Sequence, residues 1–331
     1  MKAFLFPGQG SQEIGMAEEL FQCDAAFCRL VQLASECAGA DLRKLALRGP
    51  ERELVKTEFL QPLLVAVSLG YGRRLLGRDV EPDIVLGHSL GEISALAAAG
   101  VLTDEQAVQV AARRGQLMSA AATRSPGGMV AVLSPQRAQV LALLSGLLQT
   151  GQVCLANDIA PGQLVFSGAS AGLAAAATML SQAGLGPCKR LPVSGPWHSH
   201  LMAKASEEFA TWLAGMAFKK PRIPMLMNTS ATAEAEPETI RRLVVRNLTE
   251  PVQWRSGMER LKEMRVQELF EVGPGRVLSG LARANGLGDH IQVFNINNLR
   301  GLELATRRAC PARPQRAPSE PALPGGNARQ P

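Results

Sequence analysis

Aromatic residues are scarce in this chain: they make up 4% of its 331 residues, and only one is a tyrosine. The positive charge is also unevenly spread, because residues 307–331 hold five arginines and one glutamate out of a formal net charge of +6. A nucleic-acid surface needs a basic face, and single-strand binding usually adds aromatic rings on which bases stack. We therefore expect no nucleic-acid partner.

Closely spaced cysteines are absent as well. The six cysteines include no C-x-x-C pair, and the four histidines do not cluster with them. This spacing argues against a zinc site and a disulfide framework, and predicts buried, reduced thiols. No apolar run reaches the roughly 18 residues that span a bilayer. The apolar N-terminal segment stops at Pro7 and Gly8, before it has the length of a signal peptide. We expect a cytoplasmic protein without a membrane partner.

One short segment does carry a chemical signature. Residues 87–91 (GHSLG) follow the apolar run 84–86 and precede an alanine-rich segment, 92–99. A buried strand, a tight turn between glycines and a helix form the context in which G-x-S-x-G is a nucleophile elbow. The glycines permit close backbone approach and tolerate strained geometry, and the helix N-terminus suits negative charge. The pattern predicts that Ser89 is a nucleophile.

Three other segments carry polar groups whose roles the residues alone leave open. The glycine-rich turn at 7–11 suits an ordinary strand-to-helix connection as well as a close approach to a ligand. Arg113 and Arg114 lie in a predicted helix, where paired arginines usually face solvent. His198 and His200 lie in a loop with turn-forming residues, and either one is a candidate for chemistry or for an incidental surface position.

Strand-like and helical segments alternate along most of the chain, which favours a largely parallel sheet covered by helices on both faces. We therefore predict an α/β fold. Its large subdomain, α/β-hydrolase-like with a mostly parallel sheet, comprises residues 1–126 and 194–306. Residues 307–331 contain six prolines and no apolar period, so we expect a disordered basic tail there.

Residues 127–193 form a different pattern. Their order, β-α-β-β-α-β, is typical of a ferredoxin-like unit, which we predict as a small subdomain inserted into the large one. A cleft between two such units is a common place for a ligand. The expected strands are 129–133, 153–157, 163–167 and 189–193, and the expected helices are 135–148 and 171–183.

Taken together, six motifs resemble those of the malonyl-CoA:acyl carrier protein acyltransferases of fatty acid and polyketide synthesis, in the same order. The closing run 297–303 (NNLRGLE) is similar to discrete acyltransferases that serve polyketide synthases in trans. The similarity extends from about residue 2 to residue 303, and the basic tail has no counterpart in the family pattern. The six motifs are 6–12 (FPGQGSQ), 87–92 (GHSLGE), Arg114-Gly115 with Met118, Ser194-Gly195-Pro196 with His198 and Leu201-Met202, 251–254 (PVQW) and 271–275 (EVGPG).

The resemblance implies an enzyme that transfers a malonyl group from malonyl-CoA to the phosphopantetheine thiol of an acyl carrier protein, by a ping-pong mechanism through a malonyl-serine intermediate. It assigns the nucleophile to Ser89 and the base to His198, because a serine hydroxyl needs a base to take its proton. It assigns the oxyanion hole to the backbone N–H groups of Gln9 and Leu90. It also reverses the interpretation of Arg114, whose guanidinium would bind the malonyl carboxylate.

No acidic residue stands at a motif position to orient the histidine. The resemblance implies a main-chain carbonyl in that role, and we expect it from the loop around Gln253. Asn157 and Met118 are further pocket candidates. At the positions of Leu90 and Trp197 the sequence resembles malonyl-specific members, in which an aromatic residue near the pocket leaves little room for a branched acyl group.

The expected partners are malonyl-CoA and an acyl carrier protein, either free or within a polyketide synthase, and we expect a monomer. Apart from the substrate we expect no cofactor and no metal. A serine hydrolase such as a thioesterase uses the same elbow and histidine and stays an alternative, as does a relative that loads malonate onto a malonate decarboxylase. A transferase must keep water from the acyl-enzyme, whereas a hydrolase must admit it. The six motifs favour transfer.

Overall fold

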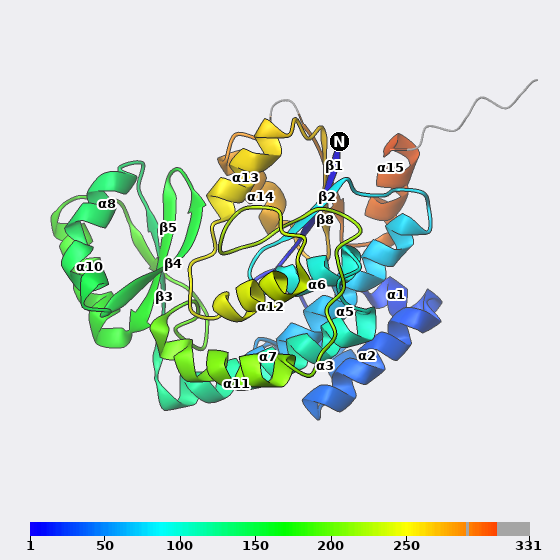
Figure 1. Ribbon diagram of the computed structural model, residues 1–331, viewed down its shortest axis with the longest axis horizontal. Coiled ribbons are helices and arrows are strands. Elements are labelled where there is room, and N and C mark those ends of the chain that lie inside the picture. The colour runs from blue at the N-terminus through cyan, green and yellow to red at the C-terminus, as the bar shows by residue number, and fades with distance from the viewer. Residues whose placement is uncertain (289–290, 310–331) are drawn as a thin grey trace, which may run out of the picture.

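The computed structural model describes residues 1–288 and 291–309, which form two subdomains, each built on its own sheet (Figure 1). The sheet of the larger subdomain has the strand order β7-β2-β1-β8-β9, and every neighbouring pair in it is parallel. This confirms the predicted parallel sheet, although the sequence analysis did not predict its edge strand β9. The strands are β1 Lys2–Phe6, β2 Ile84–Gly87, β7 Met225–Leu226, β8 Glu268–Val272 and β9 Gln292–Ile296.

Helices cover both faces of this sheet. They are α1 Glu18–Cys23, α2 Ala25–Ala38, α3 Leu42–Arg48, α4 Glu51–Leu54, α5 Thr57–Leu76, α6 Gly91–Ala98, α7 Asp104–Arg124, the 3₁₀ turn η1 His200–Met202, α11 Ala203–Leu213, α12 Pro237–Arg246, α13 Trp254–Glu263, α14 Val277–Ala284 and α15 Leu299–Ala309. Successive side chains of a strand point to opposite faces. Phe4 and Phe6 of β1 therefore join the core formed with α2, α5, α6 and α7, whereas Ala3 and Leu5 pack with α13 and α14.

The register of the central strands brings two turns together. Phe6, the last residue of β1, pairs with Gly87, the last residue of β2. The turns that contain Gln9 and Ser89 therefore leave the sheet at the same carboxyl edge, where open α/β sheets bind their ligands. A hydrogen bond from the His88 N–H to the Phe6 carbonyl, 3.0 Å long, connects the two turns directly.

The smaller subdomain has an antiparallel sheet with the order β4-β5-β3-β6, which confirms the ferredoxin-like prediction. Its elements are β3 Gly127–Leu133, α8 Arg137–Leu143, α9 Ser145–Gln149, β4 Val153–Ala160, β5 Gln163–Ala169, α10 Ser170–Gln182 and β6 Cys188–Arg190. The helix expected at 135–148 is divided at Leu144, where Ser145 and Gly146, both weak helix formers, follow. Strand β4 continues three residues beyond its expected end at residue 157. Strand β6 stops at Arg190, before its own expected end at residue 193.

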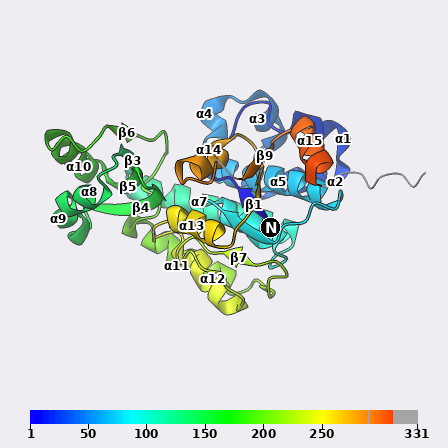
Figure 2. The same cartoon turned by 90° about the horizontal axis from the view of Figure 1, so that it is seen from above.

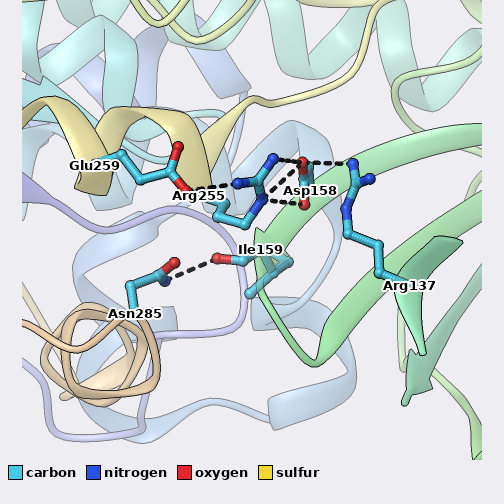
Figure 3. Close-up of polar contacts among 6 residues, drawn as sticks. All are labelled: Arg137, Asp158, Ile159, Arg255, Glu259 and Asn285. Atoms are coloured by element: carbon cyan, nitrogen blue, oxygen red, sulfur yellow. Dashed lines mark hydrogen bonds and ion pairs between the residues drawn. The ribbon is translucent and has the colours of Figure 1, made fainter. Parts of the chain in front are cut away.

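Strand β4 also connects the two subdomains through its backbone. Val252, in the loop before α13, donates its N–H to the Ala156 carbonyl (2.9 Å) and accepts from the Asp158 N–H (3.0 Å). The side chain of Asn285, which directly follows α14, donates to the Ile159 carbonyl at 2.9 Å (Figure 3). In both overall views, α13 lies beside β4 (Figures 1 and 2). The junction is therefore a continuation of the small sheet into the large subdomain.

A buried ion-pair cluster lies at the same junction. The Asp158 side chain, 2% exposed, accepts hydrogen bonds from Arg137 of α8 at 2.8 Å and from Arg255 of α13 at 3.1 to 3.2 Å (Figure 3). Arg255 also binds Glu259, one turn further along α13. Buried charges are tolerated when they are paired in this way. The carboxylate of one strand thus holds a helix from each subdomain.

Two expectations about the chain need correction. The five cysteines in the described part of the chain are free thiols, but Cys23 is exposed and the other four are half-buried, not buried, and Cys23 and Cys37 lie near helix ends. Helix α15 includes Arg307 and Arg308, so the predicted tail cannot begin at residue 307, because the buried Leu302 anchors a helix that continues past it. The remainder of the predicted tail, 310–331, lies outside the described residues. Among the described helices, none has the length and apolar character needed to cross a membrane.

Candidate active site

Ser89 lies in the turn between β2 and α6 and has a positive backbone φ of 52°. Two glycines make this turn possible. A Cβ atom on Gly91 would lie 1.9 Å from the Phe6 carbonyl oxygen, and one on Gly87 would lie 2.0 Å from the backbone of Gly91. A side chain at either position would separate α6 from β1 and β2. The predicted strand, glycine-flanked turn and helix are all present, with the strain located at the serine.

The Asn228 side chain holds this turn in place. Its Oδ1 accepts from the Ser89 N–H at 2.7 Å, and its Nδ2 donates to the Gly87 carbonyl at 2.7 Å. The Asn228 N–H in turn donates to the buried carboxylate of Glu92 at 2.6 Å. Asn228 follows β7, which pairs with β2, so sheet topology brings it beside the elbow. The sequence analysis missed its role, although a polar residue two positions after a short buried strand was a usable signal.

His198 is the second central residue. Its Nε2 lies 2.8 Å from the Ser89 Oγ, and its Nδ1 lies 2.6 Å from the Asn247 carbonyl oxygen. Because that carbonyl can only accept, Nδ1 carries a proton, and in a neutral ring Nε2 is then free to accept from the serine. His198 is 3% exposed, and like Ser89 it has a positive backbone φ, of 57°. The structure therefore brings Ser89 and His198 together as expected.

The carbonyl that orients His198 was wrongly predicted. It belongs to Asn247, and not to the loop around Gln253. Asn247 follows the last residue of α12, and the last carbonyls of a helix have no partner within it, so they remain free to accept. The Gln253 carbonyl is already occupied, because it accepts from the Gly257 N–H in the first turn of α13 at 3.0 Å.

Burial determines the protonation of the ionisable groups around the elbow. Burial, with a smaller contribution from the positive charge of Arg114, lowers the pKa of His198 to about 3. Burial also lowers the pKa of His88, to about 4. Burial raises the pKa of Glu92 to about 7, against the hydrogen bonds from Asn228. At neutral pH both imidazoles are neutral, which is the form that can take a proton.

A cavity of about 190 Å³ opens in front of Ser89 and His198, between the two subdomains. Besides these two residues, four other predicted ones line it, namely Gln9, Met118, Asn157 and Trp197. Leu90 does not line the cavity, so its expected role as a pocket wall is wrong. At the start of α6 its side chain turns into the hydrophobic core and is 1% exposed.

The backbone amides of Gln9 and Leu90 differ from most others at this edge of the sheet. Neither N–H donates a hydrogen bond to any group within the described ranges 1–288 and 291–309. Leu90 directly precedes the first residue of α6, where helix N–H groups have no intrahelical acceptor. Gly8, next to Gln9, packs so closely on His88 that a Cβ there would lie 2.5 Å from the His88 carbonyl oxygen. The two free amides therefore remain at the elbow.

Arg114 of α7 is 1% exposed, so it does not belong to a solvated helix face. Its Nη1 donates to Gln61 Oε1 and its Nη2 to Asn247 Oδ1, both at 3.0 Å. Within the described residues it forms no ion pair. Burial lowers its pKa to about 10, an effect that the charge of Glu92 opposes. Arg114 does not itself line the cavity, but Gln61 connects it to Met118, which does, through a 3.3 Å contact with the thioether sulfur.

Gln61 and Asn247 were also missed. Gln61 is fully buried within an otherwise apolar stretch of α5, and such an isolated amide in an apolar helix is a signal that the sequence does contain. Asn247 offers no comparable signal. His200, which falls outside the family motif, is exposed, and its Nδ1 lies 3.3 Å from the Cys154 sulfur. Over the described part of the chain, no group of three His, Cys, Asp or Glu residues is arranged to hold a metal ion.

These features define an acyltransferase site, and the chain belongs to the acyl transferase domain family, whose model matches residues 3–282. It is 34% identical over 304 residues to the malonyl CoA-acyl carrier protein transacylase of Bacillus subtilis, covering 92% of this chain and 95% of that protein. The crystal structure of an acyl carrier protein S-malonyltransferase from Vibrio cholerae superimposes with a TM-score of 0.86 at 34% identity, over 92% of this chain and 99% of the other. A malonyl-transacylase in complex with a type II polyketide synthase acyl carrier protein gives 0.87 at 34% identity, over 93% and 99%.

Proposed function

We propose that this protein transfers a malonyl group from malonyl-CoA to the phosphopantetheine thiol of an acyl carrier protein. The observation that carries this proposal is a buried arginine that no carboxylate of the described residues contacts directly, connected through one residue to a serine-histidine pair. Arg114 contacts Asn247, and the carbonyl of Asn247 orients His198. Such a guanidinium is suited to a carboxylate at the far end of an acyl chain that the serine attacks.

The chemistry begins with the Ser89 hydroxyl. Neutral His198 accepts the hydroxyl proton at Nε2 while the oxygen attacks the thioester carbonyl, and the resulting imidazolium protonates the departing thiolate of coenzyme A. The Asn247 carbonyl holds the ring in the tautomer that this step needs. The carrier-protein thiol then gives its proton to His198 and attacks the malonyl-serine ester, which restores the free hydroxyl. The overall scheme is a ping-pong transfer.

The reaction also requires stabilisation of the negative charge that develops on the thioester carbonyl oxygen. The free N–H groups of Gln9 and Leu90 supply two donors for this oxyanion, from turns that the sheet register places side by side. One such donor typically contributes about 2.7–4 kcal/mol to transition-state stabilisation. Trp197 and Met118 narrow the cavity beside them, which favours an unbranched malonyl group. One extra methyl group changes such a preference by roughly 1–3 kcal/mol.

The partner is a carrier protein of fatty acid or polyketide synthesis. The similarity to a transacylase that was solved with a polyketide carrier protein supports the second context. We further propose that the enzyme acts as a monomer and without a metal or redox cofactor, because each step above uses only side chains and backbone amides of this chain.

Mass spectrometry of the intact protein tests the proposal. Incubation with malonyl-CoA is expected to add one malonyl group at Ser89. When carrier protein is then added, the enzyme should lose the malonyl mass and the carrier protein should gain it. Ser89→Ala, which keeps the fold, serves as the control that takes up no malonyl group. Loss of the malonyl mass to water at the same rate with and without carrier protein would identify a hydrolase instead.

A further inference from the structure

Asn247 occupies an unusual position between the two halves of the proposed chemistry. It is 1% exposed and follows the end of α12, far in sequence from both residues that it contacts. Its backbone carbonyl accepts from His198 at 2.6 Å, while its side-chain oxygen accepts from Arg114 at 3.0 Å. One residue therefore touches the histidine through its main chain and the arginine through its side chain.

The other end of this amide has no partner. A guanidinium only donates hydrogen bonds, so the oxygen of the Asn247 amide must face Arg114 and the nitrogen must lie on the other side of the same carbon. That Nδ2 is buried and makes no hydrogen bond to any described residue. Because the two amide atoms share one carbon, the free N–H group lies next to the guanidinium.

The neighbouring amide of Gln61 does not share this property. Its Oε1 also accepts from Arg114, but its Nε2 donates to the Gln9 side chain at 3.2 Å and approaches the Met118 sulfur at 3.3 Å. Buried amide donors are almost always paired, and an unpaired one in a native site calls for an explanation. Asn247 Nδ2 is thus the donor beside Arg114 that remains available for a ligand.

We propose that the Asn247 side chain donates a hydrogen bond to the same carboxylate that Arg114 binds, and so selects acyl thioesters with a free terminal carboxylate. This inference rests on the proposed malonyl transfer and adds a specificity residue to it. An acetyl group has no acceptor at that point and leaves the amide unpaired, whereas a carboxylate oxygen pairs with both the guanidinium and the amide. The main-chain contact to His198 is the same with either substrate.

Asn247→Asp tests the proposal. The aspartate keeps the size, the backbone carbonyl and an oxygen for Arg114, but it replaces the donor by a second acceptor and neutralises the guanidinium. We expect kcat/KM for malonyl-CoA to fall about 100-fold, and acetyl-CoA transfer to fall at least about tenfold less than that. Asn247→Ala, which removes the amide but no backbone atom, is expected to lower the malonyl value about 10-fold.

Two controls separate a role in specificity from general damage. The rate at which a neutral sulfonyl fluoride inactivates Ser89, measured well above the pKa of His198, should fall far less than malonyl transfer in both variants, because the carbonyl behind His198 is retained. Gln116→Glu, an equivalent amide-to-acid change on α7, alters an amide that bonds the Cys37 carbonyl and no other group of the described chain, and should leave the malonyl-to-acetyl ratio unchanged. Equal loss with both substrates, or no loss with malonyl-CoA, overturns the inference. A wild-type protein that takes up no malonyl group contradicts the proposed function itself.

Discussion

Arg114 and Arg255 both bond side chains from other parts of the fold, yet their surroundings are opposite. Arg255 lies against the buried carboxylate of Asp158, and that hydrogen bond raises the pKa of its guanidinium (Figure 3). Arg114 is more deeply buried and contacts only two neutral amide oxygens, so that burial lowers its pKa to about 10. The first arginine has a carboxylate in direct contact, while within the described residues no carboxylate contacts the second, on which Glu92 acts only through its charge.

This difference teaches how a binding arginine is distinguished from a structural one. A buried cation without a carboxylate is costly, and a fold that keeps one gains when an anionic ligand arrives. An arginine already paired with a buried acid gains nothing from such a ligand. The type of partner therefore indicates the role more clearly than burial alone, and the following experiments test that distinction.

The largest effect is expected from Arg114→Ala. Removing one partner of a buried charged pair typically costs about 2–5 kcal/mol, so kcat/KM for malonyl-CoA should fall about 30- to 5,000-fold. Residual acetyl transfer should fall far less, because an acetyl group has no carboxylate to bind. Competition between the two thioesters measures the ratio directly. Equal losses for both substrates would remove Arg114 from carboxylate recognition.

Asp158→Asn should affect stability and leave selectivity intact. The change leaves Arg137 and Arg255 without their shared carboxylate, and both arginines are only about one-quarter to one-third exposed, at 32% and 25%. We expect the free energy of unfolding to fall by roughly 2–3 kcal/mol, less than for fully buried pairs because solvent screens part of the charge. Urea denaturation measures it. A malonyl-to-acetyl ratio that changed as in Arg114→Ala would erase the contrast between the two arginines.

The two arginines should also differ in their effect on His198. A nearby cation disfavours the imidazolium, and Arg114 contributes in this way to lowering the pKa of His198 to about 3. Arg114→Ala should therefore raise that pKa and move the acid limb of Ser89 inactivation by a neutral sulfonyl fluoride to higher pH. Arg255→Ala should leave the limb where it is. An unchanged limb in Arg114→Ala argues against coupling between the guanidinium and the base.

The smallest effect is expected at an exposed pair. Arg260 and Glu263 on α13 form an ion pair with side chains 52% and 61% exposed. Solvent-exposed pairs contribute little, so Glu263→Gln should change the free energy of unfolding by less than about 0.5 kcal/mol and leave transfer unaffected. A thermal unfolding curve compared with that of Asp158→Asn gives the measurement. A loss of unfolding free energy similar to that in Asp158→Asn would show that burial does not determine how much these ion pairs contribute to stability.

Local patterns in the sequence were sufficient to predict the elbow and the type of both sheets, although not the edge strand β9. The glycines around Ser89 are required by contacts within the strand-turn-helix unit itself, and the alternation of apolar segments predicts the parallel sheet. The family motifs placed His198 correctly. These signals lie within short stretches of chain, where spacing and local geometry are closely linked.

The residues that were missed depend on distant contacts. Asn228 and Ser89 are 139 positions apart, and Asn247 and His198 are 49 apart. Which helix presents its free carbonyl to the histidine depends on how α12 packs, so the loop around Gln253 was a reasonable but wrong choice. The side-chain direction of Leu90 likewise depends on how α6 packs on the core.

The positive φ at Ser89 also limits which nucleophiles this turn can accommodate. A left-handed backbone is especially unfavourable for residues branched at Cβ, whereas unbranched residues tolerate it better. Threonine carries the same hydroxyl as serine but has a methyl group on Cβ. Cysteine changes the attacking atom and leaves Cβ unbranched. The backbone therefore favours a thiol over a secondary alcohol as a replacement, so conformation as well as reactivity determines how the chemistry of this site can vary.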